Sequence, residues 1–211
     1  SKKLKLIGVT GTKGKTTSTF MIKSILESHG MKVGLIGSIA VFLGENQLEE
    51  TDRTTPEAFD IQRNLARMVD EGVEVAVIET CSQAMKLFRV YGCDFDVALF
   101  TNLSEDHISP KEHPDMEDYF NCKLMLLKEA KCCVINNDDK KVSTITSLLP
   151  KKNIKTFAIK NDADFKVNQE SVVISDSFID FSILYDGKYE KIEASIPGEF
   201  SIYNAAGAIA V

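Results

Sequence analysis

The first fifty residues carry two apolar runs, with a helical stripe between them and a weak alternation after them. The runs predict strands at residues 4–9 and 32–36. The stripe repeats apolar residues at the i, i+3, i+4 spacing of one helix face and stops at a glycine: Ile22, Ile25, Leu26 and Gly30. Residues 38–50 alternate weakly around a Gly-Glu-Asn turn, a pattern typical of a β-hairpin.

Further apolar runs at residues 73–78, 95–100 and 132–135 do not alternate cleanly. Such runs are typical of strands covered on both faces, as in a parallel sheet flanked by helices. Helical patterns lie between and after them, at residues 115–129 and from the Asn-Asn-Asp-Asp segment to about residue 149. The alternation of strands and helices predicts an α/β fold with a doubly wound, mostly parallel sheet.

One more helix is predicted before residue 72, with Ala58, Ile61, Leu65 and Met68 on its buried face. Thr55 fits its N-cap and Pro56 its first turn. From about residue 155 the pattern changes to short alternating strands with Asp-Gly-type turns, which predicts a small antiparallel β lobe over about 155–196. Residues 204–211 look like a helix that is cut short.

Composition narrows the class of protein. The 211 residues are 44% hydrophobic and 27% charged, as in a globular protein, with a net charge of −6. That charge and the lack of a dense basic cluster argue against a nucleic-acid partner. No apolar stretch reaches membrane-spanning length. The five cysteines are odd in number and lack paired C-x-x-C spacing, so we expect reduced thiols and a cytoplasmic protein, without zinc or a disulfide framework.

A glycine-rich turn follows the first strand and precedes the first helix, the setting of a phosphate-binding loop. It reads Thr-Gly-Thr-Lys-Gly-Lys-Thr-Thr, more compact than the general P-loop pattern because Val9 takes the place of the first glycine. The candidate nucleotide-binding residues are Gly11, Thr12, Lys13, Gly14, Lys15, Thr16 and Thr17. Lys15 would reach the terminal phosphates, and the Thr16 hydroxyl would bind Mg²⁺. The sequence therefore predicts a P-loop-type fold that binds ATP or a related nucleotide.

Polar residues follow three of the predicted parallel strands, at the edge of the sheet where ligands gather: Glu79, His107 and Asn136. A carboxylate at the end of an apolar strand needs a partner, and Mg²⁺ shared with Thr16 would supply one. Alternatively, Glu79 caps the short helix after it. His107 is equally compatible with a ligand and with an ordinary hydrogen-bonded residue, whereas His29 and His113 fit a surface or hydrogen-bonded role.

Lys123 lies on the predicted buried face of the helix over 115–129, with Phe120 and Leu127. An ammonium group there must reach solvent, pair with another group or lose its proton. In the last case the neutral amine can take up CO₂ and become a carbamate, which binds a metal ion as a carboxylate does. The residues alone leave open whether Lys123 stays an ammonium that reaches solvent or pairs, or becomes a carbamate.

Taken in order, these motifs resemble the ATP-binding central domain of the Mur ligases, which build the peptide stem of bacterial peptidoglycan. The resemblance covers essentially residues 1–211 and rests on these segments: Thr10–Thr17, Thr54–Glu57, Glu79–Ser82, Thr101–His107, Asp118–Lys123, Val134–Asp139 and Pro197–Phe200 with Asn204. The Thr-Thr-Pro and Asn-Leu-Ser-x-Asp-His segments are most similar to the member that adds the third amino acid to UDP-N-acetylmuramoyl-L-alanyl-D-glutamate.

The resemblance implies a reaction and roles for residues. ATP would phosphorylate a substrate carboxylate to an acyl phosphate, which an incoming amine then attacks. Lys15 would stabilise the γ-phosphate, Thr16 and Glu79 would hold one Mg²⁺, and His107 and carbamylated Lys123 a second. Asn136 and Asn204 would lie near the nucleotide. The implied contacts to the muramoyl-dipeptide are Thr54, Thr55, Ser82 and Arg89.

Two departures from the family pattern stand out: Cys81-Ser82-Gln83 replaces Ser-Ser-His, and Phe200-Ser201 replaces His/Phe-Asn. The resemblance implies that the uridine-nucleotide domain and the amino-acid-binding domain are absent here, so we expect this fragment, a monomer, to bind nucleotide weakly and to ligate nothing. Two alternatives are another ligase of the same fold (folylpolyglutamate, cyanophycin or poly-γ-glutamate synthetase) and a non-catalytic nucleotide-binding module.

Overall fold

The computed structural model describes residues 3–106, 108–109 and 112–211. Within them the strands form one mixed sheet in the order β11-β10-β9-β8-β7-β6-β1-β5-β2-β3-β4. Seven neighbouring strands of the described residues run parallel: β2 (Val33–Ile36), β5 (Val75–Glu79), β1 (Lys5–Thr10), β6 (Val97–Phe100), β7 (Cys132–Asn136), β8 (Asn153–Ala158) and β9 (Phe165–Ile174). The predicted doubly wound, mostly parallel sheet is confirmed.

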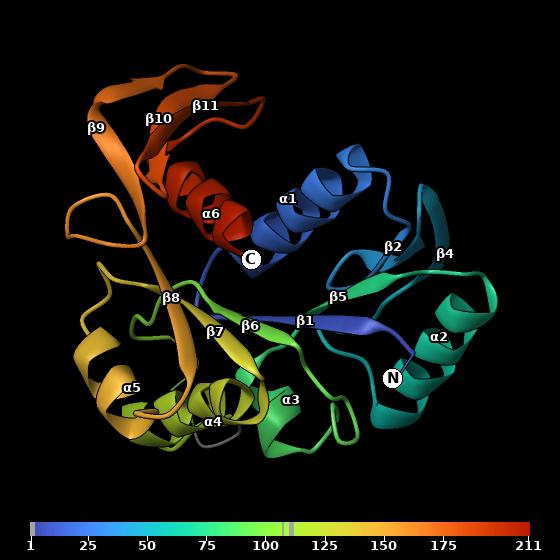
Figure 1. The fold of residues 1–211 in the computed structure, drawn as a ribbon. Helices are drawn as coiled ribbons and strands as arrows, with labels where there is room; N and C mark the ends of the chain where they lie inside the picture. The colour runs from blue at the N-terminus through green and yellow to red at the C-terminus, as the bar shows by residue number, and fades with distance from the viewer. Residues whose placement is uncertain (1–2, 107, 110–111) are drawn as a thin grey trace.

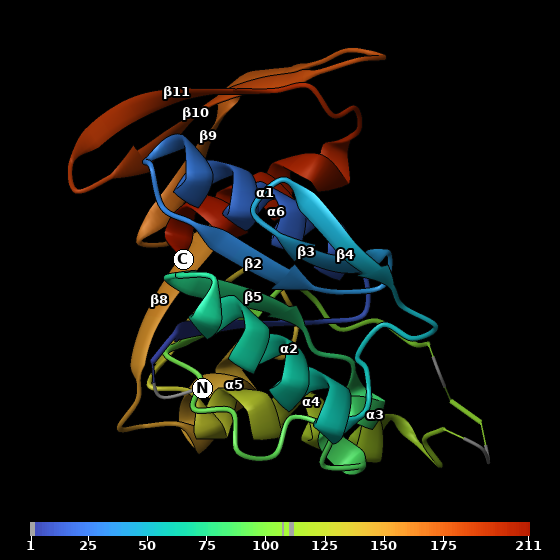
Figure 2. The ribbon, with the colours of Figure 1, turned by 90° about the vertical axis from the view of Figure 1, so that its right-hand side faces the viewer.

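Helices cover both faces of this sheet (Figures 1 and 2). One face carries α1 (Lys15–Ser28) and α6 (Glu199–Ala210), which lie side by side. The other carries the remaining helices: α2 (Ala58–Asp70), α3 (Ser82–Lys86), α4 (Met116–Glu129) and α5 (Val142–Leu148). A separate apolar cluster fills each interface, which explains why β5 is buried along its whole length.

Antiparallel strands extend the sheet at both edges. On one side β3 (Ala40–Leu43) and β4 (Asn46–Glu50) form the predicted hairpin. On the other, β9 (Phe165–Ile174), β10 (Ile179–Tyr185) and β11 (Lys188–Ala194) form an antiparallel lobe beside α6 (Figure 1). This confirms a small antiparallel lobe near the C-terminus.

Three local predictions were wrong: the direction of one strand, the cap of one helix and the start of another. The strand expected to open the antiparallel lobe, β8, instead runs parallel to β7, because α5 returns the chain to the same end of the sheet. Thr55 does not cap α2: Glu57 precedes that helix, and Pro56 lies outside its first turn. The last helix begins at Glu199, before the predicted start at residue 204. Strand direction and cap position depend on tertiary packing that the local pattern does not contain.

Candidate active site

The phosphate loop has the backbone shape that its glycines predict. It joins β1 to α1, with Gly11 at φ 149° and Gly14 at φ 83°, conformations that favour glycine. A Cβ on Gly11 would lie 1.9 Å from Thr101 Oγ1, and one on Gly14 would lie 2.1 Å from Asn204 Oδ1. Both positions therefore favour glycine for backbone conformation, and a Cβ would have to displace the side chain of Thr101 or of Asn204.

The segment after β6 holds this loop in place. Thr101 Oγ1 donates to the Lys13 carbonyl at 2.7 Å, and the Asn102 side chain both donates to that carbonyl at 2.9 Å and accepts from the Lys13 N–H at 3.0 Å. The Thr12 N–H donates to the Asn102 carbonyl at 2.9 Å. No separate role was predicted for Thr101 and Asn102, although both lie in the Thr101–His107 segment that resembles the family motif.

Lys15 and Lys123 meet at one backbone oxygen. Lys15 Nζ donates to the carbonyls of Gly11 at 3.1 Å and Thr12 at 3.0 Å, and Lys123 Nζ donates to Gly11 at 2.8 Å. Burial lowers the pKa of Lys15. The Lys15 ammonium beside the loop suits a polyanion such as a phosphate chain.

Lys123 is 1% exposed, so its predicted burial is confirmed and it does not reach solvent. Its Nζ lies 4.2 Å from the centre of the Tyr119 ring. Burial, and then the neighbouring charge of Lys15, lower the pKa of Lys123 to about 7. This shift favours the neutral amine, the form that reacts with CO₂.

Glu79 is 2% exposed at the end of β5 and points toward the start of α1. Its Oε1 accepts from Thr16 Oγ1 at 2.9 Å, and its Oε2 accepts from the N–H and the hydroxyl of Ser38, both at 3.0 Å. These partners of the carboxylate lie at the start of α1 and after β2, not at the start of α3, so Glu79 does not act as the cap of α3 here. The Thr16 hydroxyl and the Glu79 carboxylate are brought together as predicted, and both are oxygen donors of the kind Mg²⁺ prefers.

A pocket of about 140 Å³ opens beside the two lysines. Its lining comes from the start of α1, the turn before α2, α3, α4 and the segment before α4: Lys15, Thr54, Cys81, Ser82, Gln83, Glu112, His113, Tyr119 and Lys123. Thr54 and Ser82, two of the four predicted substrate contacts, therefore share a pocket with Lys15 and Lys123. The predicted ligand His107 lies outside the described residues.

The other two predicted substrate contacts do not line this pocket. Thr55 is fully buried; its hydroxyl donates to the Glu79 carbonyl at 2.7 Å and accepts from the Cys81 N–H at 3.0 Å. Arg89 is 8% exposed and donates to the Thr55 carbonyl at 3.2 Å, with Glu57 3.2 Å from its other terminal nitrogen. In this structure the Thr55 hydroxyl bonds to the backbone at the end of β5, and Arg89 bonds to the backbone of Thr55.

Asn204 lies against the phosphate loop, and Asn136 contacts the segment after β6 that holds the loop. Asn136 donates to the Thr101 carbonyl at 2.9 Å and accepts from the Asp138 N–H at 3.0 Å. Asn204, on α6, lies against Gly14, with its Oδ1 3.5 Å from the Ser18 hydroxyl. Their predicted place beside the nucleotide loop agrees with this arrangement, and their contact with a nucleotide stays a prediction.

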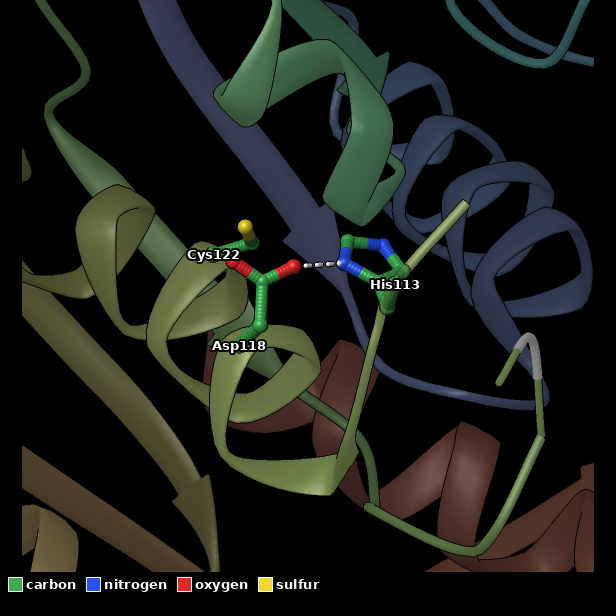
Figure 3. Close-up of side chains that lie close together, drawn as sticks. All are labelled: His113, Asp118 and Cys122. Carbon is green, nitrogen blue, oxygen red and sulfur yellow. Dashed lines mark hydrogen bonds and ion pairs between the residues drawn. The ribbon is translucent and has the colours of Figure 1, made fainter. Parts of the chain in front are cut away.

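A buried histidine network lies at the pocket; it confirms the predicted hydrogen-bonded role of His113, whose partners were not predicted. His113 is fully buried; its Nε2 lies 2.8 Å from Ser82 Oγ and its Nδ1 2.7 Å from Asp118 Oδ2. Figure 3 shows His113 facing Asp118, with Cys122 one helical turn further along α4. Because His113 and Ser82 are far apart in sequence, no local spacing could predict their contact.

The five cysteines are free, as expected. Among the described residues, no helix combines the length and the apolar composition that a membrane span requires.

The profile of the Mur ligase middle domain matches residues 9–211. A UDP-N-acetylmuramoyl-L-alanyl-D-glutamate–2,6-diaminopimelate ligase from Clostridium tetani is 46% identical over 207 residues, which cover 98% of this chain and 41% of the relative. A solved structure of a ligase of that name has a TM-score of 0.88 at 27% identity and covers 98% of this chain and 42% of that one.

A complex titled FPGS-AMPPCP has a TM-score of 0.68 at 19% identity, over 98% of this chain and 57% of the other, a likeness that shows the fold alone. This chain spans about two fifths of the length of the ligases it matches.

Proposed function

Because this chain belongs to the Mur ligase family and corresponds to its middle domain, we propose that it is the ATP-binding part of a ligase that extends the peptide stem of a peptidoglycan precursor. The full-length protein would join an amino acid to UDP-N-acetylmuramoyl-L-alanyl-D-glutamate in the cytoplasm. The observation that carries the proposal is the shared site of Lys15, Lys123 and the Thr16–Glu79 pair, at the ends of β1 and β5.

The residues present fit ATP and Mg²⁺. The cramped loop at Gly11 and Gly14 leaves backbone N–H groups at the start of α1, where phosphate oxygens are favoured. Thr16 and Glu79 would hold the Mg²⁺, which when bound neutralises phosphate charge. Lys15 would turn from the loop carbonyls to the γ-phosphate.

In the proposed reaction a carboxylate oxygen of the acceptor attacks the γ-phosphorus, and the bond to the bridging oxygen of ADP breaks. The amine of the incoming amino acid then attacks the acyl carbon, loses a proton, and inorganic phosphate leaves. The charge on the transferring group is met by Lys15, and Thr54 and Ser82 hold the acceptor in the same pocket.

Lys123 would act as a carbamate. Its neutral amine adds to CO₂ and releases a proton, which leaves a carboxylate-like anion beside Lys15. That anion, together with His107, would hold a second Mg²⁺. Mass spectrometry under mild conditions tests the modification by the added mass of CO₂ on the peptide that contains Lys123, and a Lys123→Ala protein should regain activity with short carboxylic acids.

The relatives' names suggest 2,6-diaminopimelate as the amino acid that is added. The test is a set of reactions of the full-length protein with ATP, each candidate acceptor and each candidate amino acid, followed by phosphate release. The proposal expects release only with the muramoyl-dipeptide and diaminopimelate together. Release with a folate or a poly-γ-glutamate acceptor would favour another ligase of this fold. Absence of turnover with every acceptor would favour a non-catalytic nucleotide-binding module.

A further inference from the structure

A continuous chain of polar contacts runs from the protein surface to the pocket. Lys86 Nζ, at the surface end of α3, donates to Asp118 Oδ2 at 2.7 Å. The same carboxylate oxygen lies 2.7 Å from His113 Nδ1, and His113 Nε2 lies 2.8 Å from Ser82 Oγ. We call this chain of contacts, from Lys86 through Asp118 and His113 to Ser82, the relay. Its two ends, Lys86 and Ser82, lie one turn apart on α3, which packs against α4.

The contacts select one tautomer of the His113 ring. Hydrogen bonds from Lys86 and then His113 lower the pKa of Asp118, which keeps it a carboxylate that can only accept. A ring with a single proton then carries that proton on Nδ1, facing Asp118, and presents the Nε2 lone pair to Ser82. Ser82 therefore donates its hydroxyl proton to His113, and its oxygen lone pairs remain for a ligand in the pocket.

We propose that His113 and Asp118 are positioning residues that hold the Ser82 hydroxyl proton away from the pocket, so that Ser82 accepts a hydrogen bond from an amide N–H of the acceptor's peptide stem. The inference rests on the proposed function for the identity of that acceptor. The two sides of the pocket then differ in polarity: Lys15 attracts the anionic oxygens of the acceptor and ATP, and Ser82 receives an N–H donor.

A metal ion is the competing explanation for this cluster, because donor atoms of His113, Asp118 and Cys122 all lie within 4.8 Å of one another (Figure 3). Asp118 Oδ2, which faces His113, also receives the Lys86 ammonium, and both ring nitrogens of His113 already have partners. A cation between His113 and Asp118 would have to displace Lys86. The observed contacts therefore favour a hydrogen-bonded relay.

The diagnostic change is Asp118→Asn in the full-length protein, because it keeps the volume but lets the amide donate to Nδ1 and reverse the histidine tautomer. We expect the KM for UDP-N-acetylmuramoyl-L-alanyl-D-glutamate to rise roughly tenfold in Asp118→Asn and in Ser82→Ala, as for the loss of one hydrogen bond. The KM for ATP should not change. The double variant should be no worse than Ser82→Ala alone, since both changes remove the same contact.

Two controls separate positioning from general damage and from a metal site. Asp180→Asn makes the same change in a surface ion pair with Lys191, far from the pocket on β10, and should leave both KM values unchanged. Cys122→Ala should also leave them unchanged, whereas a metal site would make it as harmful as Asp118→Asn. His113→Gln keeps an acceptor near the Nε2 position and should recover part of the acceptor affinity lost in His113→Ala. Additive effects of Ser82→Ala and Asp118→Asn, or equal rises in both KM values, would overturn the proposal.

Nitrogen NMR of the histidine-labelled protein, with His113→Gln to assign the signal, tests the proton arrangement directly. The expected result is the Nδ1–H form in the unmodified protein and the Nε2–H form in Asp118→Asn. The Nε2–H form or a doubly protonated ring in the unmodified protein would overturn the inference, because Nε2 would then donate to Ser82. The Nδ1–H form in a protein that never turns over the muramoyl acceptor would instead refute the proposed function, and with it the substrate part of this inference.

Discussion

Replacing Gly14 by alanine separates the two reasons why the phosphate loop needs glycine there. Gly14 has φ 83°, and a Cβ on it would lie 2.1 Å from Asn204 Oδ1. Gly30, just past the other end of α1, also has φ 83°, but a Cβ there would meet nothing within 4 Å. Gly30→Ala is therefore a matched control that carries only the cost of the left-handed backbone.

The expected magnitudes follow from this pair. A left-handed conformation costs a residue with a Cβ about 1 to 2 kcal/mol, in both variants. The clash with Asn204 adds about 1 to 3 kcal/mol in Gly14→Ala alone, the range for overpacking a buried site. The free energy of unfolding should therefore fall further in Gly14→Ala than in Gly30→Ala by that second amount. Only Gly14→Ala should also weaken nucleotide binding.

Urea unfolding followed by circular dichroism, together with ADP titration, measures both effects in the full-length protein. Adding Asn204→Ala to Gly14→Ala removes the atom that the new Cβ meets and should recover most of the extra loss, which a double-mutant cycle quantifies. Equal stability of the two glycine variants, or no recovery with Asn204→Ala, would refute the close approach of α6 to the loop.

Three further predictions concern the charged groups. Because the pKa of Lys123 is lowered from 10.5 to about 7, the folded protein holds fewer protons than the unfolded chain between these values. Unfolding free energy should therefore rise with pH by a few kcal/mol across that window in CO₂-free, nucleotide-free buffer. Lys123→Met should lack the rise; an unchanged pH profile would contradict the burial of the amine. Glu79→Gln should raise the Mg²⁺ concentration for half-maximal activity by about tenfold, measured by phosphate release, and an unchanged Mg²⁺ dependence would place the metal elsewhere. Lys15→Ala should abolish ADP formation while unfolding stays within about 1 kcal/mol of the parent, because Lys15 is only partly buried; full turnover would exclude the loop as the reaction site.

Local signals in the sequence were sufficient for the phosphate loop and for the burial of Lys123. The loop is one strand, one turn and one helix start in succession, and Lys123 shares a helical face with apolar neighbours. The meeting of Thr16 with Glu79 could also be predicted, because parallel strands bring their ends to one edge of the sheet.

What could not be predicted depends on contacts between elements far apart in the chain. The residues next to Thr55 predict a helix cap. However, the turn before α2 packs against the end of β5, so the Thr55 hydroxyl bonds to the backbone there. The sequence predicts only a surface or hydrogen-bonded role for His113. Its contact with Ser82 depends on the packing of α3 against α4. The direction of β8 likewise depends on which neighbour it pairs with.

A crystal structure of the full-length protein with a non-hydrolysable ATP analogue and Mg²⁺ would show whether the loop after β1 binds the nucleotide. We expect the triphosphate on the loop from Gly11 to Thr16, an ion between Thr16 and Glu79, and the Lys15 Nζ turned to the γ-phosphate. A triphosphate bound away from this loop, or an ion without Glu79 among its neighbours, would contradict this expectation.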